Sequence, residues 1–472
     1  MIPKILHQIW IGPKPPPTNL MKTWKEKHPK FEYILWTEQE IHNRRLQLTC
    51  VDKINMIPEI NGKADIIRWE ILYQYGGYFV DADSICIEPF DYYFSGKSAF
   101  ATFENENVRA GLIATGTMGF IPKHPLCLDI IQWIQSNEST KLINETRAWY
   151  SVGPGLLTKM LDTGKYKDVS IYPSHCFLPI HFTGPVYEGH KKVYGYQEWG
   201  TAKQSYDTMN SVVLPKELLE PTTWVSVLVT SYNTNPLYMK ECLDSIKCQN
   251  GHFGIELVWI NDGSNDENTI QLEQLLFTFK LSTRFTCVIY KRNETNMGTA
   301  KSSNLGLESC TNELVFKMDS DDIMFPNRIK LQLDFMNKNP QAVICGANIR
   351  MFKLDGDCRV FINDTRHPNI ITWTDLYNKK SSWCMNNPTL CYRKSAIKSV
   401  GNYRTDDNRI LYIHEDYDLL ARVLKKYKMA YNLPDVLVLY RLHTNQLTHN
   451  LDIQRHESLR NDILENASMT IS

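Results

Sequence analysis

The sequence lacks an excess of charge of either sign. Its 52 Lys and Arg residues balance 52 Asp and Glu residues, which gives a formal net charge of +0. A broad binding surface for nucleic acid or for an anionic membrane would require an imbalance, so this composition argues against both partners. A local basic patch is still compatible with it.

Long apolar runs are also missing. No segment approaches the roughly 18 apolar residues that a membrane-spanning helix requires. The first residues, MIPKILHQIWIG, do not form a signal peptide, because Lys4 and His7 interrupt them early. We therefore expect a soluble, cytoplasmic-type protein without a membrane span, and any secretory role would depend on something outside this sequence.

Paired cysteines are absent as well. The 12 cysteines of this 472-residue chain contain no CxxC pair. Their spacing favours reduced thiols over a disulfide framework or a zinc site. A chain of this length is too long for one compact core, so we expect two domains or one large one.

A change in composition marks a boundary near the middle of the chain. The segment LPKELLEPTTW, residues 214–224, combines two prolines with several charges and precedes a strong β-branched run. We predict a first domain over residues 1–214, a linker over 215–224 and a second domain over 225–472. The sequence shows no close repeat between the two halves.

Strand-like and helix-like segments alternate in the second half. The runs VSVLVTSYN (225–233), IELVWINDGS (255–264) and ELVFKMD (313–319) are separated by segments with helical periodicity. This alternation predicts an α/β fold with a mostly parallel sheet and helices on both faces. Ligands bind beyond the carboxyl ends of such strands, where the polar residues that end these runs would gather.

The first half has the same pattern. IPKILHQIWI (2–11) and YFVDADSICI (78–87) are predicted strands. KADIIRWEILYQYGG (63–77) is a predicted helix with a wide apolar face, and Gly76 is the residue that would end it.

Two carboxylate pairs carry the chemical signal. Asp81 and Asp83 follow an apolar run in the first half, and Asp319 and Asp321 repeat the spacing in the second. Such a pair at a strand end can hold one hard cation, Mg²⁺ or Mn²⁺, with positions left open for phosphate oxygens. A diphosphate leaving group is what such a cation stabilises best. The alternative is a pair of solvated or turn-capping aspartates.

Three residues near the first pair fit a nucleotide ligand. Asp65 and Arg68 lie one helical turn apart and suit a ribose hydroxyl and a phosphate, although an ordinary ion pair between positions i and i+3 would read the same. Trp10 ends the first strand and could stack on a base or pack in the core.

The first half resembles glycosyltransferase family 32, whose members have the GT-A fold and a DXD motif. The resemblance rests on IPKILHQIWIG, KADIIRWEILYQYGGYFVDADSI and GFIPKHP. It implies transfer with retention of configuration. The residues it implies for nucleotide-sugar and metal binding are Trp10, Asp65, Arg68, Tyr78, Asp81 and Asp83. A further metal ligand of the family maps to Glu198 in VYGYQEWGT, with His190 as the second choice.

The second half resembles glycosyltransferase family 2, another GT-A family, over residues 225–443. SYN, NDGS, NMGTAKSSNLGL, DSDD, NNPTLCYRKSAIKSVGNYR and HEDYDLLARVLKK follow one another as that family requires. The resemblance implies an inverting enzyme with metal ligands Asp321 and His443, Asp319 on the ribose or metal, and Asp416 of the Glu415–Asp416 pair as catalytic base. It implies that Ser231, Tyr232, Asn233 and Asp262 bind the nucleotide. The family has an Arg at the position of Ser303, and Lys301, two residues earlier, would supply that positive charge instead.

The role of Asp416 also has a physical basis. An inverting displacement needs one carboxylate to accept the proton of the acceptor hydroxyl. Asp416 is predicted to begin a helix, whose positive end would keep it ionised. The alternative is an ordinary acidic helix start.

Together these observations predict two GT-A-type (Rossmann-like) domains in tandem. The function they indicate is a bifunctional, metal-dependent transferase that uses nucleotide sugars, UDP-sugars first, on a glycan or glycosylated protein acceptor. A second hypothesis keeps one inverting domain and makes the first half an acceptor- or nucleotide-binding module. A third is a metal-dependent phosphohydrolase or nucleotidyltransferase, which gives Trp10, NDGS and the Glu415–Asp416 pair no joint purpose.

Overall fold

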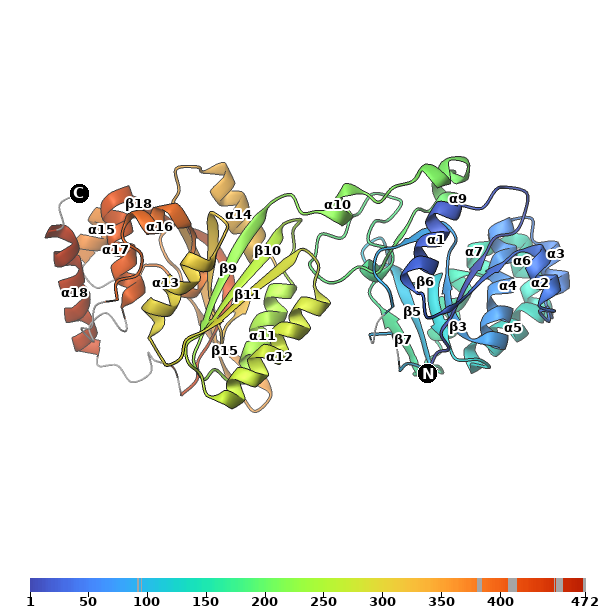
Figure 1. The fold of residues 1–472 in the computed structure, drawn as a ribbon, viewed down its shortest axis with the longest axis horizontal. Coiled ribbons are helices and arrows are strands. Elements are labelled where there is room, and N and C mark those ends of the chain that lie inside the picture. Colours follow the sequence, from blue (N-terminus) through green and yellow to red (C-terminus); the bar gives the residue numbers. More distant parts are fainter. Residues whose placement is uncertain are drawn as a thin grey trace. The chain divides into compact units, whose positions relative to one another are not determined.

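The computed structural model describes residues 1–90, 93–94, 96–379, 384–405, 414–444, 446 and 453–469. They form two compact units (Figure 1). Unit 1 comprises Met1–Tyr187 and Lys192–Pro215, and unit 2 comprises Glu188–Lys191 and Lys216–Ser472. Within the described ranges, no helix has both the length and the apolar character needed to cross a bilayer.

Unit 1 is built on a six-stranded mixed sheet in the order β2-β1-β3-β6-β5-β7. β1, β2 and β3 are parallel, β6 runs antiparallel to both β3 and β5, and β7 is parallel to β5. The strands are β1 Ile5–Ile9, β2 Glu32–Trp36, β3 Gly77–Val80, β5 Ala99–Asn105, β6 Arg109–Phe120 and β7 Val169–Tyr172, and a separate ribbon pairs β4 Ser84–Cys86 with β8 Gly195–Gln197. The helices are α1 Thr18–Lys27, α2 Glu38–Asn43, α3 Val51–Met56, α4 Ile60–Tyr75, α5 Pro125–Gln135, α6 Asn137–Glu145, α7 Ala148–Ser151, α8 Pro154–Leu161 and α9 Gly200–Lys203, with short 3-10 turns η1 Ser174–Cys176 and η2 Tyr206–Ser211.

Helix α4 confirms the helix predicted over residues 63–77 and begins three residues earlier. Gly76 ends it with a φ of 63°, and a Cβ there would lie 2.5 Å from the backbone nitrogen of Pro122. Only glycine fits this turn, because a side chain would meet both the left-handed backbone and a neighbouring strand. The tight turn carries the chain directly from α4 into β3, which ends at the first carboxylate pair.

The side chains of β3 alternate between two separate hydrophobic clusters. Phe79 belongs to a cluster with Trp69 and Met118, whereas Tyr78 and Val80 belong to a second cluster on the other face of the sheet. Successive strand residues point to opposite faces. Phe79 and Asp81 therefore share a face, and Tyr78 does not.

A buried histidine makes the stability of unit 1 depend on pH. His7 is fully buried; its Nδ1 accepts from the indole of Trp36 at 3.0 Å and its Nε2 lies 2.8 Å from the carbonyl oxygen of Gly76. Both contacts are satisfied by the neutral ring, and burial lowers the pKa of His7 to about 4. Because the unfolded state binds the proton more readily, stability is full above the unfolded pKa and is lost as the pH falls toward the folded value.

We expect unit 1 to lose about 2–3 kcal/mol between pH 7.5 and 4.5 through this residue. Calorimetry of the full chain at a series of pH values measures it, with the unit 1 transition identified by its sensitivity to His7→Gln. The variant should be less stable at pH 7.5 and should have a flatter pH dependence below 6.5. An equally steep dependence in His7→Gln would contradict the assignment.

Unit 2 is built on a ten-stranded sheet whose main path runs β11-β10-β9-β12-β17-β14-β18-β13. β9 to β12 are mutually parallel, and the remainder is mixed. The strands are β9 Trp224–Ser231, β10 Gly254–Asn261, β11 Thr286–Arg292, β12 Leu314–Asp319, β13 Ile323–Met324, β14 Ile344–Asp355, β15 Cys358–Asp364, β16 Ile370–Thr372, β17 Cys391–Arg393 and β18 Met429–Arg441. The helices are α10 Lys216–Leu219, α11 Pro236–Lys247, α12 Asp266–Ser282, α13 Thr299–Ser309, α14 Arg328–Lys338, α15 Trp373–Lys379, α16 Lys394–Ser399, α17 Glu415–Tyr427 and α18 Ile453–Met469, with the 3-10 turn η3 Asn387–Thr389.

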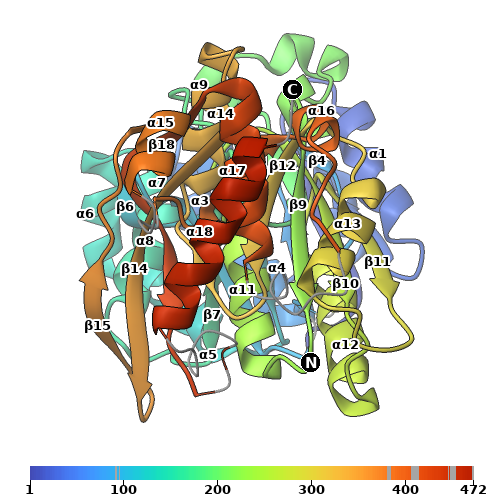
Figure 2. The same ribbon diagram turned by 90° about the vertical axis from the view of Figure 1, so that its left-hand side faces the viewer.

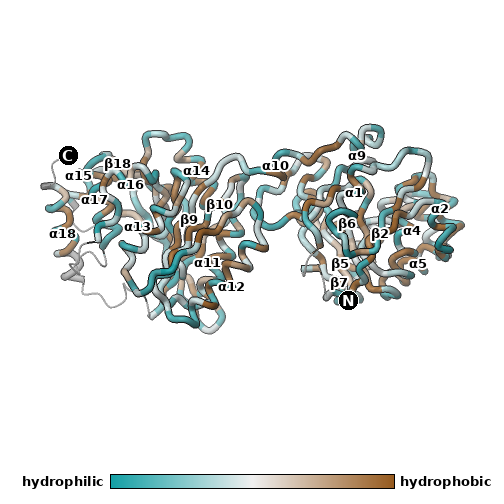
Figure 3. Tube along the Cα trace, viewed as in Figure 1, coloured by the Kyte–Doolittle hydropathy of each residue, from teal (hydrophilic) through white to brown (hydrophobic). Residues whose placement is uncertain are grey.

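The core of unit 2 follows its central strands. β9 and β10 stand out as hydrophobic in Figure 3, and β10 is buried along its whole length. Figure 2 shows α17 and α18 packed side by side on one face of the sheet. Such fully buried parallel strands place their carboxyl ends at one edge of the sheet, where the second candidate site lies.

Candidate functional sites

The strand register of unit 2 brings the polar strand ends together. Asn261 pairs with Ser231, and Asp319 pairs with Thr230, so β9, β10 and β12 end at the same level. A cavity of about 1180 Å³ opens there. The predicted residues that line it are Ser231, Tyr232, Asn233, Asp262, Asp319, Asp321, Glu415, Asp416 and His443. Lys301 is exposed on α13 and does not line the cavity, so the prediction that it supplies a charge there is not supported by its position.

The three aspartates at the end of β12 and directly after it have different surroundings. Asp321 faces the cavity, and one of its carboxylate oxygens lies 2.9 Å from Nε2 of His443. Asp319 also lines the cavity, and burial raises its pKa although Lys317 lies 3.6 Å away. Asp322 is fully buried and accepts from the backbone of Arg441 at 2.8 Å, so it braces the loop.

Asp262 holds the loop that precedes α13. Its carboxylate accepts from the backbone N–H groups of Met297 and Gly298 at 2.8 and 2.9 Å and from the amide of Asn293 at 2.8 Å. A carboxylate has about four acceptor positions, so three of them are already used by the protein. The predicted contact with a base or ribose would have to share the remaining one.

Glu415 and Asp416 begin α17. Burial raises the pKa of Asp416 to about 7 and, together with the neighbouring Asp416 charge, that of Glu415 to about 8. The expectation that the helix end would keep Asp416 ionised was therefore incomplete. The helix N-terminus favours the charged form, but desolvation has the larger effect.

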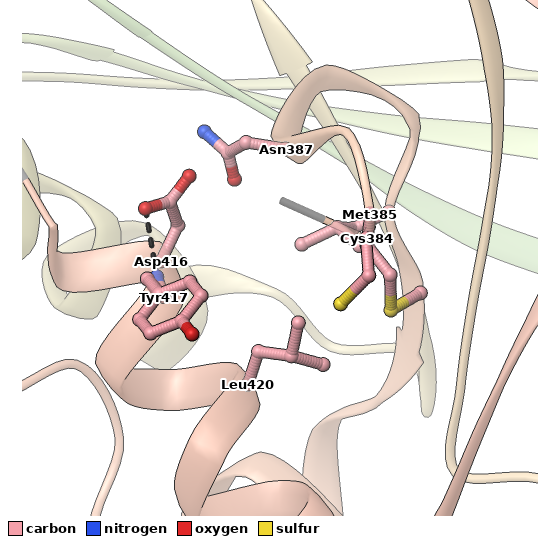
Figure 4. Close-up of a pocket in the computed structure, with 7 residues that line it drawn as sticks. Cys384, Met385, Asn387, Asp416, Tyr417 and Leu420 are labelled. Carbon is pink, nitrogen blue, oxygen red and sulfur yellow. Dashed lines mark hydrogen bonds between the residues drawn. The ribbon is translucent and has the colours of Figure 1, made fainter. Parts of the chain in front are cut away.

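Asn387, for which the sequence predicts no role, lies beside Asp416. Figure 4 shows Asp416 and Asn387 on one side of a small cavity of about 10 Å³, with Cys384 and Met385 on the other. One carboxylate oxygen of Asp416 accepts from the N–H of Tyr417 at 2.7 Å. The side-chain oxygen of Asn387 is buried there without a hydrogen-bond partner in the described structure. Asn387 belongs to the NNPTL segment that contributes to the family 2 resemblance, but the sequence predicts no role for it beside Asp416.

In unit 1, Arg68 links two predicted residues. Its guanidinium contacts Asp65 at 3.1 Å and Asp81 at 2.8 Å, and it donates to the backbone of Thr115 at 2.6 Å. Asp65 and Arg68 are both buried, so this is no ordinary surface ion pair. Desolvation raises the pKa of Asp81 to about 6, against the opposing effect of Arg68.

The second carboxylate of unit 1 is held by the segment around residues 195–200. Asp83 accepts from the side chain of Gln197 at 2.7 Å and from the backbone N–H of Gly200 at 2.8 Å. Gln197 also lies 3.4 Å from Asp81. Its register with Ser84 in the β4–β8 ribbon places it there. Gln197 was missed by the sequence reading, which favoured the residue after it.

The prediction of Glu198 as a metal ligand is corrected by this geometry. Its carboxylate accepts from the hydroxyl of Tyr196 at 2.6 Å and forms an ion pair with Lys203 at 3.1 Å. The second choice, His190, is also misplaced, because it contacts the backbone oxygens of Gln249 and Phe253 at 3.0 and 2.7 Å within unit 2.

Two aromatic predictions for unit 1 have different outcomes. Trp10 is half-buried and packs edge-on against Tyr206 at 5.7 Å between ring centroids. Burial raises the pKa of Tyr206, and the charges of Asp83 and Asp81 add to this effect, so that ring lies near the carboxylates. Tyr78 is buried in the second hydrophobic cluster, where it stacks on Phe90 at 4.7 Å. Its predicted role in nucleotide binding is therefore wrong, for the reason of strand alternation given above.

In the part of the chain that the structure describes, each candidate site offers a metal two carboxylates and no complete set of protein ligands. Among the residues that the structure describes, no group of three or more His, Cys, Asp or Glu side chains is arranged to bind one. Each site offers a pair, Asp81 with Asp83 and Asp319 with Asp321, and these oxygens suit a hard cation whose remaining ligands come from a diphosphate.

Known families match both parts of the chain. Residues 226–401 match the model of Glycosyl transferase family 2, and residues 17–100 match that of the Glycosyltransferase sugar-binding region containing DXD motif. The chain therefore belongs to the glycosyltransferases, with a DXD region and a family 2 region in tandem.

Named relatives agree with this class. The Amylovoran biosynthesis glycosyltransferase AmsE of Erwinia amylovora is 30% identical over 217 residues, which are 46% of this chain and 75% of that protein. The UDP-Gal:alpha-D-GlcNAc-diphosphoundecaprenol beta-1,3-galactosyltransferase of Escherichia coli is 31% identical over 214 residues, 45% of this chain and 72% of that protein. Inositol phosphoceramide mannosyltransferase 2 of Schizosaccharomyces pombe is 28% identical over 163 residues, 33% of this chain and 44% of that protein.

Proposed function

We propose that the protein is a bifunctional, metal-dependent glycosyltransferase that uses nucleotide sugars, UDP-sugars first, on a glycan or glycosylated protein acceptor. Unit 2 would be an inverting site and unit 1 a retaining site, both of GT-A type. The observation that carries the proposal is the 1180 Å³ cavity of unit 2, which is lined by a partly exposed carboxylate pair and by a second pair, Glu415 and Asp416.

Within unit 2, Asp319 and Asp321 would hold Mn²⁺ or Mg²⁺ together with the diphosphate, and His443 would join them only after its ring turns, since the three side chains are not arranged as a metal site here. This set fits a hard cation, because the two carboxylates face the cavity and their side-chain partners leave oxygens open: Lys317 lies 3.6 Å from Asp319, and His443, 2.9 Å from Asp321, could itself turn to a metal. The cation would supply charge for the diphosphate leaving group. The strand ends at Ser231, Tyr232 and Asn233 would hold the nucleotide beside it.

Asp416 would accept the proton of the acceptor hydroxyl. A pKa near 7 suits this role, because a general base works best when its pKa lies near the working pH. Glu415, with a pKa of about 8, would be neutral under the same conditions and would donate rather than accept a hydrogen bond. This difference assigns separate roles to two adjacent carboxyl groups.

Unit 1 would bind its donor through Asp81 and Asp83, with Asp65 and Arg68 on the ribose and phosphate and Trp10 on the base.

One observation favours a second candidate function, in which unit 1 is only a binding module. Arg68, Gln197 and Gly200 already occupy the carboxylate oxygens, and Glu198 is turned away. Unit 2 would then be the single active transferase.

Donor hydrolysis by the full chain tests both candidates. We would supply a panel of nucleotide sugars with Mn²⁺ and compare wild type with Asp81→Asn and Asp321→Asn. Each substitution should abolish turnover of a different donor, because each removes one carboxylate from one site. Matched controls are Asp162→Asn in unit 1 and Asp334→Asn on an exposed face of unit 2, which should leave turnover unchanged.

The possible outcomes separate the proposals. Loss of activity in Asp321→Asn alone would make unit 1 a binding module. Activity in both variants at the wild-type level would sink the metal-dependent mechanism for both units. A donor that is not hydrolysed is examined next by titration of UDP and Mn²⁺, since binding does not need an acceptor.

A further inference from the structure

A row of aromatic side chains in unit 1 is not used by the proposed donor site. The row consists of Trp149 on α7, Phe182 and Trp199, with the guanidinium of Arg109 between the first two. Arg109 lies 5.4 Å from the Trp149 ring and 5.7 Å from the Phe182 ring, and Phe182 lies 5.2 Å from Trp199. We call these four residues the aromatic row.

The row reaches the carboxylates at both ends. Trp199 immediately precedes Gly200, whose backbone N–H donates to Asp83. At the other end, a Cβ built on Gly153 would lie 2.5 Å from a carboxylate oxygen of Asp65 and 3.3 Å from the Cα of Trp149. Asp65 is one of the two carboxylates that Arg68 holds, so the row borders the same site from two sides.

Trp149 is the exposed end of the row, and Phe182 and Trp199 are half-buried. The exposed fraction of Trp149 is 39% and that of its neighbour Tyr150 is 49%, whereas Trp24, Trp36 and Trp69 are fully buried. Exposure of neighbouring large aromatics is uncommon on a soluble protein unless a ligand or partner covers them. The stability of the fold does not explain these side chains.

Polar groups are built into the row at a fixed position. Arg109 forms an ion pair with Glu104 at 3.2 Å, and the buried His181 lies 3.3 Å from the same carboxylate oxygen. His181 also contacts the hydroxyl of Thr183 at 2.7 Å. The guanidinium is thus held near two rings by its ion pair, and its side chain stays 41% exposed.

Flat aromatic faces with a few fixed polar groups match one ligand class. A pyranoside ring has an apolar face of C–H groups and a rim of hydroxyls, so it can stack on an indole and also bond to a guanidinium and a carboxylate. A nucleobase is not the ligand that we assign to the row, because Trp10 and Tyr206 already offer a base an aromatic surface near the carboxylates.

We propose that the aromatic row is a carbohydrate subsite that binds a pyranoside residue of the acceptor glycan. Trp149 stacks on the sugar ring, and Arg109, which the buried Glu104 holds in place, bonds its hydroxyls. This inference rests on the proposed function for the position of the sugar next to the carboxylates. Both candidate functions of unit 1, sugar transfer and acceptor binding alone, require a site that binds a sugar of the acceptor.

Saturation-transfer NMR on the full chain tests the subsite. The probes are methyl α- and β-pyranosides of glucose, galactose, mannose and N-acetylglucosamine, in the presence of UDP and Mn²⁺. At least one glycoside should receive saturation, and Trp149→Ala should raise its Kd about tenfold. Arg109→Gln should also weaken binding, while Trp149→Phe, which keeps a ring, should restore most of it.

Trp224→Ala is the matched control, because that indole is 40% exposed but belongs to unit 2. It should leave saturation transfer unchanged. The proposal is overturned if no glycoside binds, if Trp224→Ala weakens binding as much as Trp149→Ala, or if Trp149→Ala changes only the association of the protein with itself. Failure of the proposed donor chemistry appears separately, as an unchanged UDP affinity in Asp81→Asn while glycoside binding persists.

Discussion

Asp416→Asn should lower kcat for transfer by unit 2 about 10²–10⁴-fold, with little change in donor affinity. The substitution keeps the shape of the side chain but removes its ability to accept a proton. Asp416 lines the cavity and has one oxygen fixed by the N–H of Tyr417, so the remaining oxygen is the one that faces the acceptor. Steady-state transfer rates and a UDP titration measure the two quantities separately.

Glu415→Gln is the matched control for this prediction. Glu415 is adjacent and buried, and its pKa of about 8 keeps it protonated at neutral pH. Glutamine resembles the protonated form, so kcat should fall by less than about tenfold, the loss of one hydrogen bond. A large loss of kcat in Glu415→Gln together with normal kcat in Asp416→Asn would show that Glu415, and not Asp416, is the base.

The pH dependence of the same reaction follows from the state of Asp416. A base must be ionised to act, and burial raises the pKa of Asp416 to about 7. The value of kcat/KM should therefore fall about tenfold per pH unit below pH 7. An activity that stays constant down to pH 5 would contradict a role for Asp416 as base.

The sequence predicts that the parallel strands of unit 2 end together at one edge of the sheet. β-Branched runs that end in polar residues form parallel strands, and the register of such strands aligns their ends. Asp319 pairs with Thr230 and Asn261 pairs with Ser231, as this argument requires. The helix that Gly76 ends was readable because only glycine takes the backbone conformation found there.

Some errors were avoidable with the same rules. Tyr78 lies three residues before Asp81 on a strand, so the two side chains must point to opposite faces. The distinction between Gln197 and Glu198 needed tertiary structure, because only the pairing of β8 with Ser84 decides which of two neighbours faces Asp83. The raised pKa of Asp416 could not be predicted, because it results from burial of the carboxyl group, which no sequence pattern shows.

Arg68→Met should destabilise unit 1 by about 3–5 kcal/mol, the largest effect that we expect on stability. The guanidinium lies between Asp65 and Asp81, and its side chain is only 6% exposed. Its removal leaves the buried carboxylate of Asp65 and the partly buried carboxylate of Asp81 without a cation, and methionine satisfies neither of them. Calorimetry of the unit 1 transition, in EDTA so that no metal replaces the lost charge, measures the change.

Arg44→Met is the matched control, because Arg44 also bonds two carboxylates of unit 1, Glu32 and Glu40, but on the surface. Its loss should cost no more than about 1 kcal/mol. The effect of Arg68→Met should also shrink at lower pH. Burial already raises the pKa of Asp65 and Asp81 above the ordinary value, and without Arg68 it rises further, so protonation in the folded state restores stability as the pH falls. Equal losses in the two variants, or a larger loss for Arg68→Met at pH 5 than at pH 7.5, would show that the buried pair does not depend on this cation.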